Sequence, residues 1–120
     1  MKKIITLLSF VMFVVMAHGN SEIEIPLYKV KKLNFNDSDK SSEPGLLMRQ
    51  LEYLSTASTE ELIEFYKKSP YVKSCSYNEL ADNYHCKLAK HGKVSSGDVF
   101  ISTKSRNGLT EVFADYFYFK

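Results

Sequence analysis

Apolar and charged residues alternate along the segment from Glu22 to Leu33, which is the period of a strand with one buried face. Pro26 lies within this segment, so we expect the strand at a sheet edge or in two parts. The next stretch, Asn34 to Glu43, is rich in Asn, Asp, Ser and Lys and contains one apolar residue, Phe35. This composition predicts an exposed loop.

A helical spacing replaces the alternation after this loop. Pro44 suits the first turn of a helix. Three leucines follow at helical spacing: Leu47, Leu51 and Leu54. A second helix is predicted from Ser58, because Ser58 and Glu61 have the spacing of a capping box, in which each side chain accepts a hydrogen bond from the other residue's amide. Pro70 ends this helix.

The two cysteines of the chain, Cys75 and Cys86, lie symmetrically about a polar loop. An antiparallel hairpin centred on residues 80–81 would pair Cys75 with Cys86 and Tyr77 with Tyr84. Opposed residues in such a ladder have Cα atoms ~4.5–5.5 Å apart, a separation that a disulfide can bridge. The spacing matches neither a CxxC motif nor a zinc-binding pattern. We therefore predict a disulfide-linked hairpin, stabilised by ~3 kcal/mol through the bond.

Asn107-Gly108 is the strongest hairpin signal in the sequence, because a type I′ turn needs positive φ at both central residues. A two-residue turn there pairs Arg106 with Leu109, and the same register pairs Ile101 with Ala114. One face of this hairpin then carries the predicted core residues: Val99, Ile101, Val112, Ala114, Tyr116 and Tyr118. The other face carries Phe100, Ser102, Phe113, Asp115 and Phe117.

Three phenylalanines, Phe100, Phe113 and Phe117, thus share a face where a sheet covered on one side should be polar. One interpretation is that the N-terminal strand or the loop from Asn34 to Glu43 folds over them, or that the sheet curls. The other is that they form a surface for a protein partner or for a second copy of the chain.

Together these elements predict an α+β fold, in which two N-terminal helices pack on a four-stranded antiparallel meander with one disulfide. The order of elements over residues 44–119 resembles the cystatin-like and nuclear-transport-factor-like rolls, in which a sheet curls around a helix. This resemblance implies a fold and no function. The predicted organisation is a signal peptide (1–19), an N-terminal strand with a flexible loop (20–43) and an α+β domain (44–120).

The first nineteen residues have the three parts of a secretory signal peptide. Lys2 and Lys3 form the basic part, residues 4–16 are an apolar run, and Ala17 and Gly19 place small residues at the cleavage site. The apolar run is shorter than the ~20 residues that span a bilayer, so no membrane anchor is expected after cleavage. We predict a periplasmic or secreted protein, which agrees with a disulfide.

The chain has 16 Lys and Arg residues and 14 Asp and Glu residues. Cleavage removes Lys2 and Lys3, so the exported chain carries 14 of each sign and has no general electrostatic attraction for nucleic acid. The stretch from His85 to Lys93 is a local exception, with basic side chains and no acidic one. It predicts either a solvated hairpin end or a loop that binds an acidic cleft on a partner.

Motifs for phosphate binding, for zinc hydrolysis and for a serine nucleophile are absent from the sequence. Asp82, His85 and His91 are residue types that suit acid–base chemistry, but the spacing singles out no nucleophile beside them. We therefore predict a protein without enzymatic activity, cofactor or metal.

The favoured hypothesis is an immunity or inhibitor protein that binds and neutralises a bacteriocin, a toxin or a cell-wall hydrolase. The chain resembles small periplasmic proteins of this kind in its size, signal peptide and single disulfide. The alternatives are an envelope accessory protein or carrier of a small apolar ligand, and a small hydrolase that uses Asp82, His85 or His91. Tyrosine is a frequent interface anchor. The predicted binding residues are Tyr77, Tyr84, His85, Lys87, Lys90, His91, Lys93, Phe100, Phe113 and Phe117.

Overall fold

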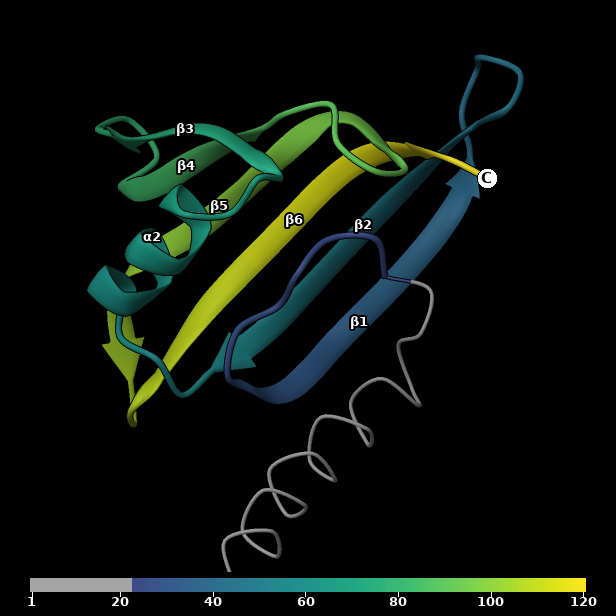
Figure 1. Ribbon diagram of the computed structural model, residues 1–120. Coiled ribbons are helices and arrows are strands. Elements are labelled where there is room, and N and C mark those ends of the chain that lie inside the picture. Colours follow the sequence, from purple (N-terminus) through teal and green to yellow (C-terminus); the bar gives the residue numbers. More distant parts are fainter. Residues whose placement is uncertain (1–22) are drawn as a thin grey trace, which may run out of the picture.

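The computed structural model describes residues 23–120, which form a six-stranded antiparallel sheet with one helix (Figure 1). The strands are β1 (Val30–Lys40), β2 (Leu46–Ser55), β3 (Val72–Asn78), β4 (Asn83–Leu88), β5 (Val94–Arg106) and β6 (Leu109–Phe119). Their order across the sheet is β1-β2-β6-β5-β4-β3. The helix, α2 (Thr59–Lys67), connects β2 to β3. The predicted signal peptide lies outside the described residues.

The predicted arrangement of two helices on a four-stranded meander is wrong. The predicted first helix is strand β2, and most of the predicted loop from Asn34 to Glu43 belongs to strand β1. A spacing of four residues, as between Leu47 and Leu51, fits a strand as well as a helix. The alternating burial from Arg49 to Ser55 shows that the period is two. The element order behind the resemblance to the cystatin-like and nuclear-transport-factor-like rolls is therefore not present.

The capping box at the start of α2 is confirmed. The Ser58 hydroxyl accepts a hydrogen bond from the Glu61 amide at 3.1 Å, and a Glu61 carboxylate oxygen accepts one from the Ser58 amide at 2.9 Å. This amide, together with the nearby Lys29 ammonium, lowers the pKa of Glu61. Leu62 and Tyr66 lie on the buried side of the helix, which packs against β3, β4 and β5.

The hairpin of β3 and β4 has the predicted register, with Cys75 opposite Cys86 and Tyr77 opposite Tyr84. The two cysteines form a disulfide, as predicted. The turn at Asn107-Gly108 also pairs Arg106 with Leu109, but an irregularity follows in β5. Beyond it Ile101 lies opposite Val112, which is a slip of two residues from the prediction. A slip of two leaves each side chain on its predicted face.

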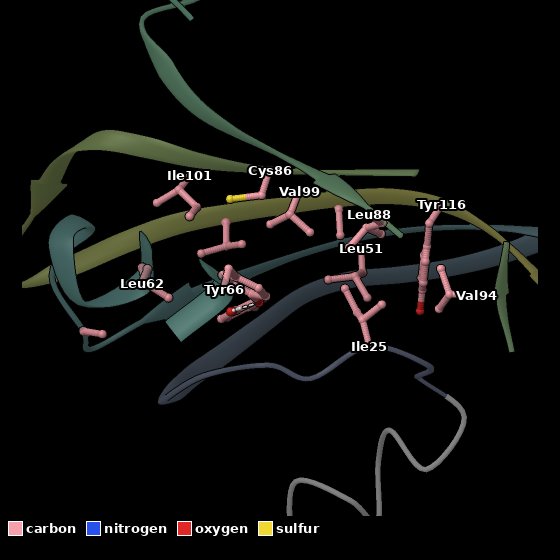
Figure 2. Close-up of a cluster of buried hydrophobic side chains, with 14 residues drawn as sticks. Ile25, Leu51, Leu62, Tyr66, Cys86, Leu88, Val94, Val99, Ile101 and Tyr116 are labelled. Atoms are coloured by element: carbon pink, nitrogen blue, oxygen red, sulfur yellow. Dashed lines mark hydrogen bonds between the residues drawn. The ribbon is translucent and has the colours of Figure 1, made fainter. Parts of the chain in front are cut away.

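One face of the sheet, here called the core face, is closed by α2 and by residues 23–29, which run across it without strand structure (Figures 1 and 2). Ile25 from this N-terminal segment is buried against the sheet. The predicted core residues of β5 and β6 are confirmed as buried. They are Val99, Ile101, Val112, Ala114, Tyr116 and Tyr118.

A chain of hydroxyl hydrogen bonds fastens the N-terminal segment to the core face. The Tyr66 hydroxyl donates its proton to the Pro26 carbonyl at 3.1 Å. The Tyr53 hydroxyl must therefore donate to the Tyr66 oxygen, which lies 2.6 Å away. The Tyr53 oxygen also accepts a hydrogen bond from the Tyr28 amide at 3.2 Å. Burial is the main cause that raises the pKa of Tyr53 to about 12. Burial and the neighbouring Tyr53 likewise raise the pKa of Tyr66.

A second attachment is the buried ion pair between Glu24 and Arg49, whose guanidinium donates to both carboxylate oxygens at 2.8 and 3.1 Å. The Tyr116 hydroxyl also donates to Glu24, at 2.7 Å. Burial alone would lower the pKa of Arg49, but the hydrogen bond and the charge of Glu24 outweigh it and raise this pKa. The N-terminal segment is therefore an integral part of the fold.

Candidate functional site

Aromatic side chains form a row on the opposite face of the sheet, here called the outer face. Each strand contributes one residue to this aromatic row: Phe35, Glu52, Phe113, Phe100, His85 and Ser76, in the order from β1 to β3. The ring centroids of His85 and Phe100 are 4.9 Å apart, and Phe113 lies 6.2 Å from both Phe100 and Phe35. These separations fall in the range of favourable ring contacts.

The described residues leave the aromatic row uncovered. The N-terminal segment, which was one predicted cover, packs on the core face instead. The stretch from Asn34 to Glu43, the other predicted cover, extends the sheet as β1 and places Phe35 in the row. Phe100 and Phe113 are half-buried by their neighbours, and Phe35 is 38% exposed. An antiparallel sheet normally presents polar residues on its open face, so this row departs from the usual pattern.

Carboxylates flank the aromatic row. The next cross-strand row holds Asp37, Gln50, Asp115, Asp98 and Lys87. Asp98 and Asp115 are directly opposed, an arrangement that destabilises a sheet. By the same pairing Asp39, Glu52 and Glu111 also lie on this face. The basic side chains on these rows are Lys32 and Lys87, with the imidazole of His85. Across β1, β2 and β6 these rows therefore carry more acidic than basic side chains.

A hollow of about 250 Å³ lies beside the aromatic row. The rings of Phe100 and Phe113 and the carboxylates of Glu52, Asp82 and Glu111 line it. A neighbouring hollow of about 410 Å³ shares Asp82 and Glu111 with it, so the two form one depression that runs toward the turn between β5 and β6. Its far end carries Lys104 and Arg106.

The structure divides the predicted binding residues into two groups. Five of them lie on the outer face: His85, Lys87, Phe100, Phe113 and Phe117. The others lie elsewhere. Tyr84 packs on the core side, where Tyr77 contacts its ring. His91 packs edge-on against Tyr71 in the loop after β4, between the exposed Lys90 and Lys93. The basic stretch does not form one patch, because only His85 and Lys87 share a face with the aromatic row.

The acid–base residues of the hydrolase hypothesis do not come together. His85 Nε2 lies 2.5 Å from Asp98 Oδ1, whereas Asp82 accepts a hydrogen bond from the Tyr77 hydroxyl, which raises the pKa of Tyr77. His91 and Asp82 lie beyond opposite ends of β4, which places them ~20 Å apart at strand spacing. In the part of the chain that the structure describes, no group of three or more His, Cys, Asp or Glu side chains is arranged to hold a metal ion.

The sequence interpretation missed Phe35, Glu52, Asp98 and Glu111 as members of this face. Phe35 and Glu52 belong to strands that were predicted as loop and helix, so their place in a sheet was hidden. The alternation of Arg49, Leu51 and Tyr53 with Gln50 and Glu52 is the signal that would have revealed strand β2.

Comparison of the chain with protein-family models, with curated proteins and with solved structures found no match. Among residues 23–120, no helix has the length and apolar character needed to cross a membrane. The disulfide is compatible with an exported protein.

Proposed function

We propose that this protein is an exported, non-enzymatic binding protein of the immunity or inhibitor type, which neutralises a bacteriocin, a toxin or a cell-wall hydrolase in the periplasm. The observation that carries the proposal is the uncovered row of Phe35, Phe113, Phe100 and His85 across the outer face. Contiguous apolar surface rimmed by polar groups is typical of protein interaction sites.

The row is well suited to recognition because its rings are held in place before a partner arrives. They project from β1, β6, β5 and β4, and three of them are half-buried against their neighbours. The disulfide between Cys75 and Cys86 ties β4, the strand of His85, to β3. A preorganised surface loses little conformational entropy on binding, so more of the contact free energy appears as affinity.

The hypothesis of an apolar-ligand carrier receives less support. The hollow at Phe100 and Phe113 has a volume of about 250 Å³, below the roughly 300–1,000 Å³ of small-molecule pockets. Phe117, the third ring of the hypothesis, does not line it. The neighbouring hollow of about 410 Å³ is large enough, but charged and polar side chains such as Lys104 and Glu111 line much of it.

The test is capture of the partner with the secreted protein as bait in cultures of the producing cell, followed by calorimetric titration of the purified pair. Replacing Phe113→Thr removes the central ring of the row, and we expect ~10-fold or greater loss of affinity, as for an interface hot spot. The matched control is Leu80→Ser, which removes an apolar side chain that is 100% exposed in the turn between β3 and β4. We expect this control to bind as the wild type does.

Two results would contradict the proposal. One is a partner whose affinity is the same for wild type and Phe113→Thr, with both proteins shown to be folded by circular dichroism. The other is the recovery of no protein partner at micromolar bait.

A further inference from the structure

We infer that the partner presents a cationic surface to the outer face, and that one of its arginine side chains enters the hollow at Phe100 and Phe113. This inference rests on the proposed function and names the class of partner. It follows from the charges and rings of the outer face.

Charge complementarity favours a cationic partner. The exported chain is neutral as a whole, yet the outer face gathers six carboxylates: Asp37, Asp39, Glu52, Asp98, Glu111 and Asp115. The basic side chains of this face lie toward its margins, with Lys32 on β1, with His85 and Lys87 on β4, and with Lys104 and Arg106 at the far end of the depression. A partner of opposite charge gains association rate and specificity from such a surface.

The direct opposition of Asp98 and Asp115 also favours a cationic partner. His85 forms an ion pair with Asp98. Asp115 takes part in none of the salt bridges found among the described residues. Like charges opposite one another destabilise a sheet, and nearby cations of a bound partner would relieve this repulsion. The acidic row is thus better matched to a complex than to the isolated protein.

A second copy of the chain is a poor occupant of the same face. Two outer faces in contact would bring together two surfaces that each carry more carboxylates than basic groups, and like-charge juxtaposition across an interface is unfavourable. The aromatic row alone would allow such a dimer, so the charges decide between the two occupants.

The hollow has the chemistry to hold a guanidinium group. The rings of Phe100 and Phe113 line the hollow and can contact a planar cation, and the Glu52 and Glu111 carboxylates can accept its hydrogen bonds. A volume of about 250 Å³ suits a single side chain better than a separate ligand. Lys104 and Arg106 repel a cation from the far end of the depression, so the arginine is directed to the phenylalanine end.

The test uses a hexa-arginine peptide as probe and a hexa-glutamate peptide as its opposite. The secreted protein is titrated with each at low and physiological salt, while NMR records the phenylalanine ring signals and calorimetry records affinity. We expect the arginine peptide to shift the rings of Phe100 and Phe113, to bind at least 3-fold more weakly to Glu111→Gln and to weaken with salt. The control Glu60→Gln, an exposed carboxylate of α2 on the core-face side, should bind as the wild type does.

Equal effects of Glu111→Gln and Glu60→Gln on affinity, or peptide binding that leaves the ring signals of Phe100 and Phe113 unshifted, would overturn the arginine site. Preferential binding of the glutamate peptide, or self-association through the Phe113 ring without peptide binding, would overturn the cationic partner. An acidic natural partner that still requires Phe113 would refute this inference and leave the proposed function intact. Arginine binding at the hollow, without any protein partner in culture, would refute the proposed function and leave the arginine site intact.

Discussion

Both faces of the sheet carry aromatic and charged side chains, but these side chains have different roles on each face. On the core face, buried tyrosines, an arginine and a glutamate form two groups of hydrogen bonds. Both join the sheet to the N-terminal segment, and the Tyr53–Tyr66 group also joins it to α2. On the outer face, phenylalanines and carboxylates lie in neighbouring rows, and the described residues do not cover them. A closed network favours one structure, whereas an uncovered row of rings and charges favours a partner.

This difference indicates where stability and recognition reside. A change on the core face leaves buried polar groups without partners, so it should affect the free energy of unfolding strongly. A change on the outer face removes groups that are only partly buried, so it should affect binding more than stability.

Removing the carboxylate of the buried ion pair should be the most damaging single change. Glu24→Ala leaves the buried Arg49 guanidinium without its main counter-charge, and breaking such a pair typically costs about 3–5 kcal/mol. Urea unfolding followed by circular dichroism measures the loss. The matched control is Glu43→Ala in the turn between β1 and β2, where an exposed carboxylate should change stability by less than ~0.5 kcal/mol. Similar losses in both variants would show that the N-terminal segment contributes little.

Removing the disulfide should be the next most costly change. The double variant Cys75→Ala with Cys86→Ala should lose ~2–4 kcal/mol, because the unfolded chain regains the entropy of an open loop. Unfolding of the wild type with and without a reducing agent provides an independent estimate of the same quantity. Equal stability of the oxidised and reduced wild type would contradict the prediction.

Alkaline pH should destabilise the protein through its buried tyrosines. Tyr53 has a pKa of about 12 when folded and ~10 when unfolded, so the folded state holds a proton that the unfolded state releases between these values. The stabilisation is complete below pH 10 and is lost as the pH rises toward 12, to a total of ~2–3 kcal/mol for this group. Urea unfolding at pH 8 and pH 11 measures the change. A Tyr53→Phe variant with the same pH dependence as wild type would refute the assignment to Tyr53.

Neutralising a carboxylate of the outer face should have the smallest effect on stability, and it should stabilise the protein, whereas the changes above destabilise it. Asp115→Asn removes the repulsion with Asp98 and should raise the free energy of unfolding by ~0.2–1 kcal/mol, while it weakens binding of the hexa-arginine peptide. The control Glu60→Gln, at an exposed carboxylate of α2, should neither raise the free energy of unfolding nor weaken binding of the hexa-arginine peptide. A loss of stability in Asp115→Asn would mean that this carboxylate supports the sheet.

The C-terminal half of the chain was largely predictable, because its signals are local. The Asn107-Gly108 turn and the two cysteines each set a register, and alternation then assigned the faces of β5 and β6 correctly. The irregularity between Ile101 and Ser105 had no clear signal, but it moved the pairing by two residues and so preserved the faces.

The N-terminal half was not predictable in the same way, because β2 gains its structure from distant partners. Its leucines at positions 47 and 51 fit a helix and a strand equally, and pairing with β6 decides between them. Without β2 as a strand, Glu52 and Phe35 had no place beside Phe113. The aromatic row therefore became visible only in the structure, although three of its rings were already candidate binding residues.

An NMR footprint of the captured partner on the protein would show directly whether the outer face is the binding surface. We expect the ring signals of Phe35, Phe100 and Phe113 to shift or broaden on binding, while those of the core-face tyrosines Tyr53 and Tyr66 stay unchanged. A footprint on the loop of Lys90 and Lys93 or on α2, with the three phenylalanine signals unaffected, would contradict this prediction.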